Sequence, residues 1–367
     1  MCYSFYMTAT ALQQLISERI GRAGPITFAD YMRMALYEPG YGYYVSGAAK
    51  MGWEGDYFTS SDVSSLFAHC LGRQLYQWWE KLGRPDPFIV LEQGAGRGDL
   101  AQDVRDWAAR DAPDLACALD YRAADIRLGQ DAIAGAAPAE RAAVVVCNEL
   151  VDAFPVHLVE ARAKKLYEVC VAAQDGRLCE TLAEPSTPEL AAYLERFHVP
   201  WATFGDGWRA EINLDALRWL HRAAQLLRRG YILTIDYGDR AKALYALRRQ
   251  RGTLRGYWRH QLSYNPLAHP GEQDITAHVN FSALIDEGRR LGLRLNAFTT
   301  QRDWLKGLGI DDELERRRVG EFAAAHAERA SDRGQVALLK WYDLRNRLAT
   351  LTDLSGMGSF KVLIMRR

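Results

Sequence analysis

Three closely spaced glycines in the first half of the chain could hold a nucleotide-like ligand. The apolar run Ile89–Leu91 leads through Glu92 into Gly94, Gly96 and Gly98. Small residues at such a turn let a ligand approach the backbone and the start of the following helix. Dinucleotide enzymes use the spacing Gly-x-Gly-x-x-Gly, which differs from the Gly-x-Gly-x-Gly found here. The acid before the turn would repel a pyrophosphate, so the pattern favours a cofactor with a cationic aminoacyl end over a nicotinamide dinucleotide.

Polar side chains also end the next two apolar runs. Asp125 stands where nucleoside-binding α/β proteins place an acid that accepts hydrogen bonds from ribose. Asn148, Glu149 and Asp152 follow the run Ala143–Cys147, at the crevice where ligands of open α/β sheets bind. The amide could hold a planar nitrogen nucleophile, and the two carboxylates could bind a guanidinium and accept its proton. Roles as turn or cap residues remain open for all four.

The elements that must position these residues alternate between short apolar runs and helices. Such alternation predicts a parallel, doubly wound α/β sheet. We expect helices to begin at about Asp99 and at the cap Asn213, the latter ending at Gly230. The predicted buried strands are Phe88–Leu91, Tyr121–Ala124, Ala143–Cys147 and Tyr231–Ile235.

The remaining segments predict elaborations of this core. Three helices, over Thr8–Gly21, from Thr27 and over Val63–Leu82, are expected to form a layer within residues 1–85. The core then covers 86–240, an insertion that caps the strand ends covers 241–330, and residues 331–367 complete the sheet. Further helices are predicted from Asn280 and over about 311–329. The runs Val156–Val159, Leu166–Ala172 and Leu178–Leu182 predict an antiparallel addition, and Val336–Trp341 with Phe360–Met365 a closing antiparallel hairpin.

Composition narrows the class of protein. Lys and Arg together number 46, as do Asp and Glu, so no overall basic field favours a nucleic-acid partner. The six cysteines form no Cys-x-x-Cys pair and no zinc-type spacing with histidine, which argues against disulfides and a bound metal. No signal, transit or membrane-spanning segment is recognisable. We therefore expect a cytoplasmic protein without a metal, nucleic-acid or membrane partner.

These motifs together resemble a known family, the MidA-like methyltransferases, which includes the mitochondrial complex I assembly factor described as a protein arginine methyltransferase. The likeness runs through most of the chain, with Asp62 and Asn280 standing where the family usually has glutamate and aspartate. The matching motifs are Tyr37–Tyr44, Gly55–Ser60, the glycine turn, Asn148-Glu149 with Asp152 and Pro155, Asp236–Gly238, Arg251–Arg255, His260, Pro270-Gly271 and Asp274–Phe281.

The resemblance implies a fold, a cofactor and a site. The fold is the class I methyltransferase fold, a Rossmann-like sheet of seven strands, and the cofactor is S-adenosylmethionine. The segment Gly55–Ser60 would fold back over the aminoacyl end of the cofactor, while Asp131–Arg141 is short and is expected to lack the strand and loop that pack on adenine. The implied cofactor-binding residues are Thr59, Ser60, Glu92, Gly94, Gly96, Gly98, Asp125 and Asn148.

The working hypothesis is in-line methyl transfer to an arginine nitrogen of a protein, such as a respiratory-complex subunit. Glu149 and Asp152 are the predicted catalytic residues, and Asp236, His260 and His278 the predicted contributors to the substrate pocket. A methyltransferase with a small-molecule acceptor, a nicotinamide-dependent oxidoreductase and a non-catalytic assembly factor of the same fold are the competing hypotheses. The oligomeric state is left open, with a homodimer as one option.

Overall fold

The computed structural model describes residues 10–47, 59–126, 141–259, 261–327 and 332–367. They form two compact units, and each is built from separate stretches of the chain. Unit 1 comprises residues 1–57, 151–218 and 238–284, and unit 2 comprises 58–150, 219–237 and 285–367. The helices α8 (Leu214–Leu226) and α10 (Phe281–Arg290) span the two boundaries at 218 and 284.

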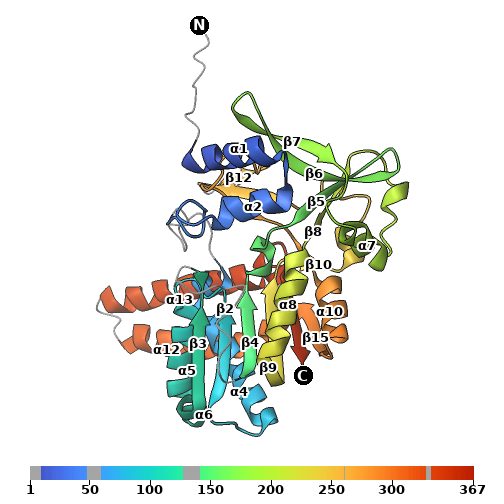
Figure 1. The fold of residues 1–367 in the computed structure, drawn as a ribbon. Helices are drawn as coiled ribbons and strands as arrows, with labels where there is room; N and C mark the ends of the chain where they lie inside the picture. Colours follow the sequence, from blue (N-terminus) through green and yellow to red (C-terminus); the bar gives the residue numbers. More distant parts are fainter. Residues whose placement is uncertain (1–9, 48–58, 127–140, 260, 328–331) are drawn as a thin grey trace. The chain divides into compact units, whose positions relative to one another are not determined.

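Unit 2 contains the predicted α/β sheet. Its described strands lie in the order β15-β16-β9-β4-β2-β3 (Figure 1). The four strands β3, β2, β4 and β9 are parallel, and β16 runs antiparallel to both β9 and β15. The strands are β2 (Phe88–Gln93), β3 (Leu119–Ala124), β4 (Ala142–Asn148), β9 (Leu227–Asp236), β15 (Arg294–Thr300) and β16 (Lys361–Arg366).

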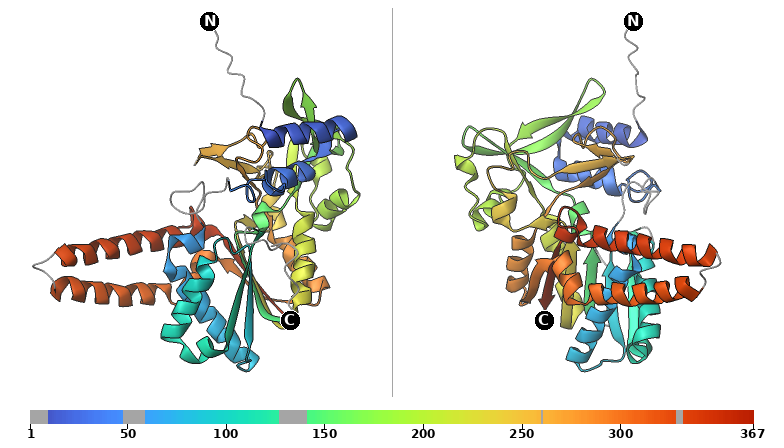
Figure 2. Two further views of the ribbon diagram at one scale, coloured as in Figure 1. Left: turned by 60° about the vertical axis from the view of Figure 1, so that its left-hand side comes forward. Right: turned by 180° about the vertical axis from the view of Figure 1, so that it is seen from behind.

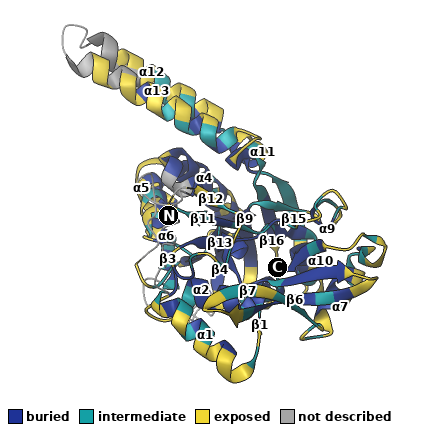
Figure 3. Cartoon of the chain, turned by 90° about the horizontal axis from the view of Figure 1, so that it is seen from above, coloured by how far each residue is buried: buried dark blue, intermediate teal, exposed yellow. Residues whose placement is uncertain are grey.

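Helices cover this sheet and share one hydrophobic core with it. Trp78 of α4 stacks on Tyr231 of β9 with ring centroids 4.5 Å apart, and Trp107 of α5 packs so closely that a Cβ on Gly72 would lie 2.1 Å from its ring. At the centre of the sheet, β2 is buried throughout and β4 is buried at every residue except Ala143 (Figure 3). The helices are α3 (Ser60–Val63), α4 (Ser65–Leu82), α5 (Asp99–Asp111), α6 (Pro113–Ala118), α11 (Gln301–Gly307), α12 (Ile310–Ala327), α13 (Asp332–Thr352) and the 3-10 turn Met357–Ser359.

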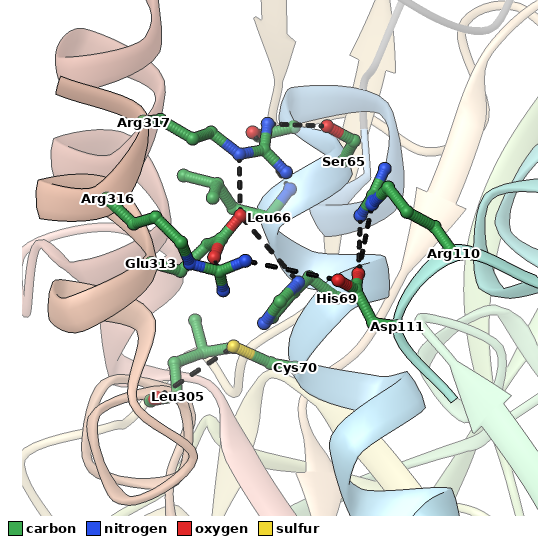
Figure 4. A network of polar contacts seen from close by, with 11 residues as sticks. Ser65, Leu66, His69, Cys70, Arg110, Asp111, Leu305, Glu313, Arg316 and Arg317 are labelled. Carbon is green, nitrogen blue, oxygen red and sulfur yellow. Dashed lines mark hydrogen bonds and ion pairs between the residues drawn. The ribbon is translucent and has the colours of Figure 1, made fainter. Parts of the chain in front are cut away.

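The helices α12 and α13 pack side by side as an antiparallel pair (Figure 2). The base of α12 is anchored to α4 by the buried carboxylate of Glu313, which binds Arg317 Nε at 2.8 Å, Arg316, and His69 Nδ1 at 3.8 Å (Figure 4). Burial is the main cause that lowers the pKa of His69. Because both side chains of this contact are at most 4% exposed, it fixes where α12 begins.

Unit 1 is built from three small sheets and short helices. The largest has the order β1-β6-β5-β8 with β7 on the other edge of β6, the second the order β12-β11-β13, and the third pairs β10 with β14. The strands are β1 (Ile26–Thr27), β5 (His157–Arg162), β6 (Lys165–Gln174), β7 (Arg177–Ala183), β8 (Trp208–Ile212), β10 (Gly238–Asp239), β11 (Arg255–Trp258), β12 (Gln261–Ser263), β13 (Asp274–Thr276) and β14 (Val279–Asn280). The helices are α1 (Ala11–Ala23), α2 (Phe28–Tyr37), α7 (Glu189–Arg196), α9 (Ala241–Leu244) and the 3-10 turns Val151–Ala153 and Trp201–Thr203.

Much of the predicted element order is confirmed. The antiparallel addition is β5, β6 and β7, and Asn280 caps α10 by accepting the N–H of Ala283 at 3.3 Å. Thr27 caps α2 in the same way, accepting from the N–H of Asp30 at 3.0 Å. The predicted helix over about 311–329 is α12, which starts one residue earlier.

Three expectations differ from the structure. The run Val336–Trp341 lies within helix α13, so the predicted closing hairpin is wrong, and the partners of β16 are β9 and β15. Gly230 does not end α8 but lies within β9, where a Cβ would come within 1.8 Å of the Ala143 oxygen of the neighbouring strand. The three amino-terminal helices, expected in one layer, are divided between the two units: α1 and α2 belong to unit 1 and α4 to unit 2.

Candidate functional site

The glycine turn follows β2 in unit 2 with the geometry that the sequence predicts. Gly94, Gly96 and Gly98 have positive φ angles of 74°, 56° and 82°. The N–H groups of Gly94 and Ala95 both donate to the Ala124 oxygen at the end of β3, at 3.0 and 3.2 Å. A Cβ on Gly94 would lie 2.8 Å from Leu150 Cδ1, so glycine is required there for both conformation and space.

The turn leads directly into a helix start that its own side chains leave uncapped. Gly98 is the N-cap of α5, a 13-residue helix, and makes no side-chain cap hydrogen bond. The first N–H groups of an α-helix have no partner within the helix, and they favour polar or anionic ligand atoms. The turn and this helix start therefore offer backbone donors to a bound molecule.

Asp125 lies beside the turn, where its carboxylate also has a structural contact. It is 7% exposed, and its Oδ2 accepts the N–H of Gly96 at 2.9 Å. The side chain thus holds the middle of the turn from the end of the neighbouring strand. The predicted ribose contact stays a prediction, since a carboxylate has lone pairs for further donors besides this N–H.

Glu92 is a buried acid at the end of β2. It is 3% exposed, and its Oε2 has no hydrogen-bond donor among the described residues. Burial raises the pKa of Glu92 to about 7; the negative charge of Asp125 adds to the rise, while Tyr121 and Arg105 act against it. An acid in this state gains most from a cationic partner, which would restore its ionised form.

The end of β4 brings together three residues from two distant parts of the chain. Asn148 Nδ2 donates to Glu149 Oε1 at 3.3 Å, and the same oxygen accepts the backbone N–H of Ser60 at 2.7 Å. Asn148 Oδ1 is buried and has no donor within the described part of the chain. Glu149 has a positive φ of 50°, a conformation that non-glycine residues adopt at a cost and that often marks functional sites.

Ser60 is tied into unit 2 by a contact that the sequence did not predict. Its side chain is fully buried, and its Oγ donates to Gln301 Oε1 at 3.0 Å. The predicted cofactor residue Thr59 precedes it and is 8% exposed, whereas residues 55–58 lie outside the described ranges. Glu149 therefore acts as a helix-start acceptor for α3, which is one of the structural roles that the sequence left open.

The remaining predicted site residues belong to different parts of the structure. Asp236 is fully buried at the end of β9, and its Oδ1 accepts the N–H of Tyr237 at 2.9 Å. Asp152 belongs to unit 1, where its backbone oxygen accepts the N–H of Ala277 at 3.0 Å. His260 lies outside the described residues.

His278 also belongs to unit 1 and is half-buried there. Its backbone N–H donates to Thr253 Oγ1 at 3.1 Å. Burial and the positive charges of Arg249 and Arg255 lower the pKa of His278 to about 4, with Asp239 acting in the opposite direction. The imidazole is therefore neutral at physiological pH, so any contact it makes with a substrate is that of an uncharged group.

Neither a metal site nor a membrane helix is found in the described ranges. No group of three or more His, Cys, Asp or Glu side chains is arranged to hold a metal ion there. Within the same residues, every helix is too short or too polar to cross a bilayer.

The fold and the turn define a class of protein. A mainly parallel sheet whose strand β2 leads into a glycine turn and a helix start is a Rossmann-like nucleotide-binding architecture. The buried, unpaired acceptors on Glu92 and Asn148 fit a ligand that brings hydrogen-bond donors and positive charge. S-adenosylmethionine carries both, in its ribose hydroxyls and its ammonium group, so the residues present suit this cofactor.

Comparison with known proteins identifies the family. A family model described as "Putative S-adenosyl-L-methionine-dependent methyltransferase" matches residues 70–133 and 130–299. The chain therefore belongs to this family and is a methyltransferase that uses S-adenosylmethionine. The oxidoreductase hypothesis is wrong, and the recognised resemblance is confirmed.

Individual relatives agree with this assignment. The chain is 28% identical over 313 residues to "Protein arginine methyltransferase NDUFAF7 homolog, mitochondrial" of Drosophila melanogaster, covering 74% of this chain and 68% of that one. It is 27% identical over 353 residues to the Mus musculus protein of that name, covering 83% and 76%. A solved structure from Burkholderia thailandensis, described as a "COG1565 superfamily member and likely methyl transferase" bound to S-adenosyl-homocysteine, matches at 30% identity with a TM-score of 0.82, covering 97% of this chain and 92% of that one.

Proposed function

We propose that this methyltransferase transfers the methyl group to an arginine side-chain nitrogen of a protein. The relatives named protein arginine methyltransferases support the acceptor class. The observation that carries the proposal in this chain is the Asn148–Glu149 turn. There a buried amide oxygen, with no donor among the described residues, lies beside the carboxylate of a residue with positive φ. An amide oxygen and a carboxylate are suited to bind the N–H groups of a guanidinium.

The residues of this chain would bind the cofactor and the acceptor arginine, orient them, and take a proton from the guanidinium. The cofactor supplies a methyl group on a positively charged sulfur, which is activated without help from the protein. The Glu149 carboxylate would accept the proton that the guanidinium nitrogen loses when it takes the methyl group from the bound cofactor. Positioning alone reaches effective molarities of about 10⁵–10⁸ M in well-oriented systems, so the turn needs to supply mainly alignment and a proton acceptor.

The roles of single residues, the seventh strand and the biological setting are part of this proposal. We place Glu92, the glycine turn, Asp125, Asn148, Thr59 and Ser60 at the cofactor, with Asp152, Asp236, His260 and His278 at the acceptor. A seventh strand is expected as well. The shortened segment Asp131–Arg141, expected to lack the strand and loop that pack on adenine, lies outside the described ranges except for Arg141. The respiratory-complex substrate, the cytoplasmic location and the homodimer likewise stay predictions.

Glu149→Gln tests the proposal most sharply, because the structure predicts two separable roles for this side chain. A glutamine keeps an oxygen that can accept the Ser60 N–H, so thermal stability and S-adenosyl-homocysteine affinity should stay within about twofold of wild type. Transfer of tritiated methyl groups into protein arginine, measured by amino-acid analysis of labelled lysate, should fall by at least about 100-fold. Glu149→Ala, which removes both roles, should lose stability as well.

The outcomes separate the competing functions. Methyl label in a small molecule, but not in protein arginine, would favour the small-molecule acceptor. Full methyl transfer by Glu149→Gln would show that the carboxylate serves only the fold. Complementation of a deletion strain by this variant, with methyl transfer abolished, would indicate a non-catalytic assembly role.

A further inference from the structure

One segment of unit 1 has a charge unlike the rest of the chain. From Arg240 to Gly271 the sequence contains seven Lys and Arg residues and no Asp or Glu. The whole protein has 46 residues of each sign. This segment, which we name the basic segment, therefore has a net charge of +7 in a protein whose formal net charge is zero. The segment carries β11, β12 and the turns that precede them.

Most of these charges have no carboxylate partner in the described part of the chain. The nearby acid Glu211 is occupied by the basic segment's own backbone, accepting the N–H groups of Thr253 and Leu254 at 2.8 and 3.0 Å. Asp274 of β13 accepts the Tyr44 hydroxyl at 2.7 Å. The basic residues that form no ion pair with a described carboxylate are Lys242, Arg248, Arg249, Arg251, Arg255 and Arg259.

Two of these arginines converge on one point. Arg255 pairs in register with Thr276 of β13, two residues before His278. The positive charges of Arg249 and Arg255 both lower the pKa of His278. Arg249 and Arg255 thus both place positive charge near His278, where the charge of Asp239 acts in the opposite direction.

The same segment presents an open strand edge beside exposed aromatic and apolar side chains. β12 is the edge strand of its three-stranded sheet (labelled in Figure 1). Leu262 on it is 43% exposed, and Tyr264 just after it is 75% exposed. Arg255 lies over the Tyr264 ring at 5.4 Å, and Arg259 lies over the Trp258 ring at 4.6 Å. An edge with unpaired backbone groups can accept an extended peptide as a further strand.

We infer that the basic segment is a docking surface for an acidic, extended stretch of polypeptide, which pairs with the β12 edge and places carboxylates against its arginines. The charge complementarity is the main argument, since six cations without acidic partners favour an anionic ligand. In taking this polypeptide to be the methyl acceptor, the inference rests on the proposed function. The acceptor would then carry acidic residues near its target arginine.

The exposed apolar side chains and the strand edge beside the basic residues favour a peptide over a nucleic acid as the ligand. Tyr264 and Leu262 are exposed next to a free strand edge, and that edge offers alternating backbone donors and acceptors that match a polypeptide. A phosphate backbone has only acceptors, so the C=O groups of the edge would be left unpaired against it.

Binding by fluorescence anisotropy tests the inference without methyl transfer, so its failure is distinct from failure of the proposed function. The probe is a labelled peptide of about twelve residues that alternates Glu and Val around one Arg, and the same peptide with Gln for Glu is its control. Wild type should bind the Glu peptide at least about tenfold more tightly than the Gln peptide, with affinity falling as salt rises.

Variants of the full chain test whether the peptide binds at the basic segment. The triple variant R248E/R251E/R259E should weaken binding of the Glu peptide by at least about tenfold, and Tyr264→Ala by about fivefold. R228E/R229E/R294E is the matched control, since it changes the net charge equally at three exposed arginines of unit 2 and should leave binding unchanged. Equal loss in both triple variants, equal binding of both peptides, or tighter binding of an oligouridylate that displaces the Glu peptide would overturn the inference.

Discussion

Replacing Glu92 by glutamine should make the ligand-free protein more stable and the cofactor complex weaker. The acid is buried at the end of β2 with one oxygen unpaired among the described residues, and its pKa is raised to about 7. A carboxyl whose folded-state pKa lies above its ordinary value opposes folding when ionised. That opposition is absent below pH 4.5, grows between pH 4.5 and 7, and is fully present above pH 7.

The size of the effect follows from the shift. A rise from 4.5 to about 7 is 2.5 units, and at 1.36 kcal/mol per unit this amounts to about 3 kcal/mol at pH 8. Glutamine has a similar shape and no charge, so Glu92→Gln should gain up to about 3 kcal/mol at pH 8 and almost nothing at pH 4.5. For a chain of this size the corresponding rise in melting temperature is about 4–6 °C.

Calorimetric melting at pH 5, 6, 7 and 8 measures this directly. The difference between Glu92→Gln and wild type should increase with pH and level off above pH 7. The exposed, ion-paired Glu18→Gln is the control and should show almost no pH-dependent difference. In the same samples, S-adenosylmethionine should bind Glu92→Gln at least about tenfold more weakly, because a neutral amide forms no ion pair with the ammonium group. A Glu92→Gln protein that is less stable at pH 8, or that binds the cofactor normally, would refute the reasoning.

Three further outcomes follow from the same geometry. Gly94→Ala should destabilise by about 1–3 kcal/mol more than Gly176→Ala in chemical denaturation, because both have positive φ but only the first Cβ would meet another side chain; equal costs would contradict the close approach. Asp125→Asn should lower cofactor affinity by about tenfold in calorimetry, by weakening the anchor of the Gly96 N–H and removing a charge, and unchanged affinity would exclude a cofactor role. His278 should show no titration between pH 6 and 9 in NMR and a midpoint near pH 4, assigned with His278→Gln. A midpoint above 6 would contradict the burial of this imidazole beside Arg249 and Arg255.

The sequence predicted the centre of the unit 2 sheet well because the strands there are short, apolar and almost entirely buried. Runs such as Ala143–Cys147 have no polar face and fit only the centre of a covered sheet. The same reasoning failed for Val336–Trp341, since a short apolar run does not distinguish a buried strand from a segment of helix. Gly230 was misread because glycine both ends helices and permits close approach between strands, and here the approach to Ala143 decides.

For the candidate site, too, some positions could be predicted from the sequence and some contacts could not. The positions of Glu92, Asp125 and Asn148 could be predicted because each lies at or directly after the carboxyl end of a strand, and parallel strands end at the same edge of a sheet. The contact between Glu149 and Ser60 joins residues 89 positions apart, and no local pattern encodes it. The arginines that surround His278 were visible only as a charge run, since their convergence depends on the pairing of β11 with β13.

Isothermal titration of the full chain with S-adenosyl-homocysteine, and with NAD under the same conditions, tests the central claim most directly. We expect saturable binding of S-adenosyl-homocysteine at about one molecule per chain, and no heat with NAD. The Gly94→Ala variant should bind S-adenosyl-homocysteine more weakly than wild type. Binding of NAD, or the absence of heat with S-adenosyl-homocysteine at millimolar concentration, would contradict the assignment of this glycine turn to a methyltransferase cofactor site.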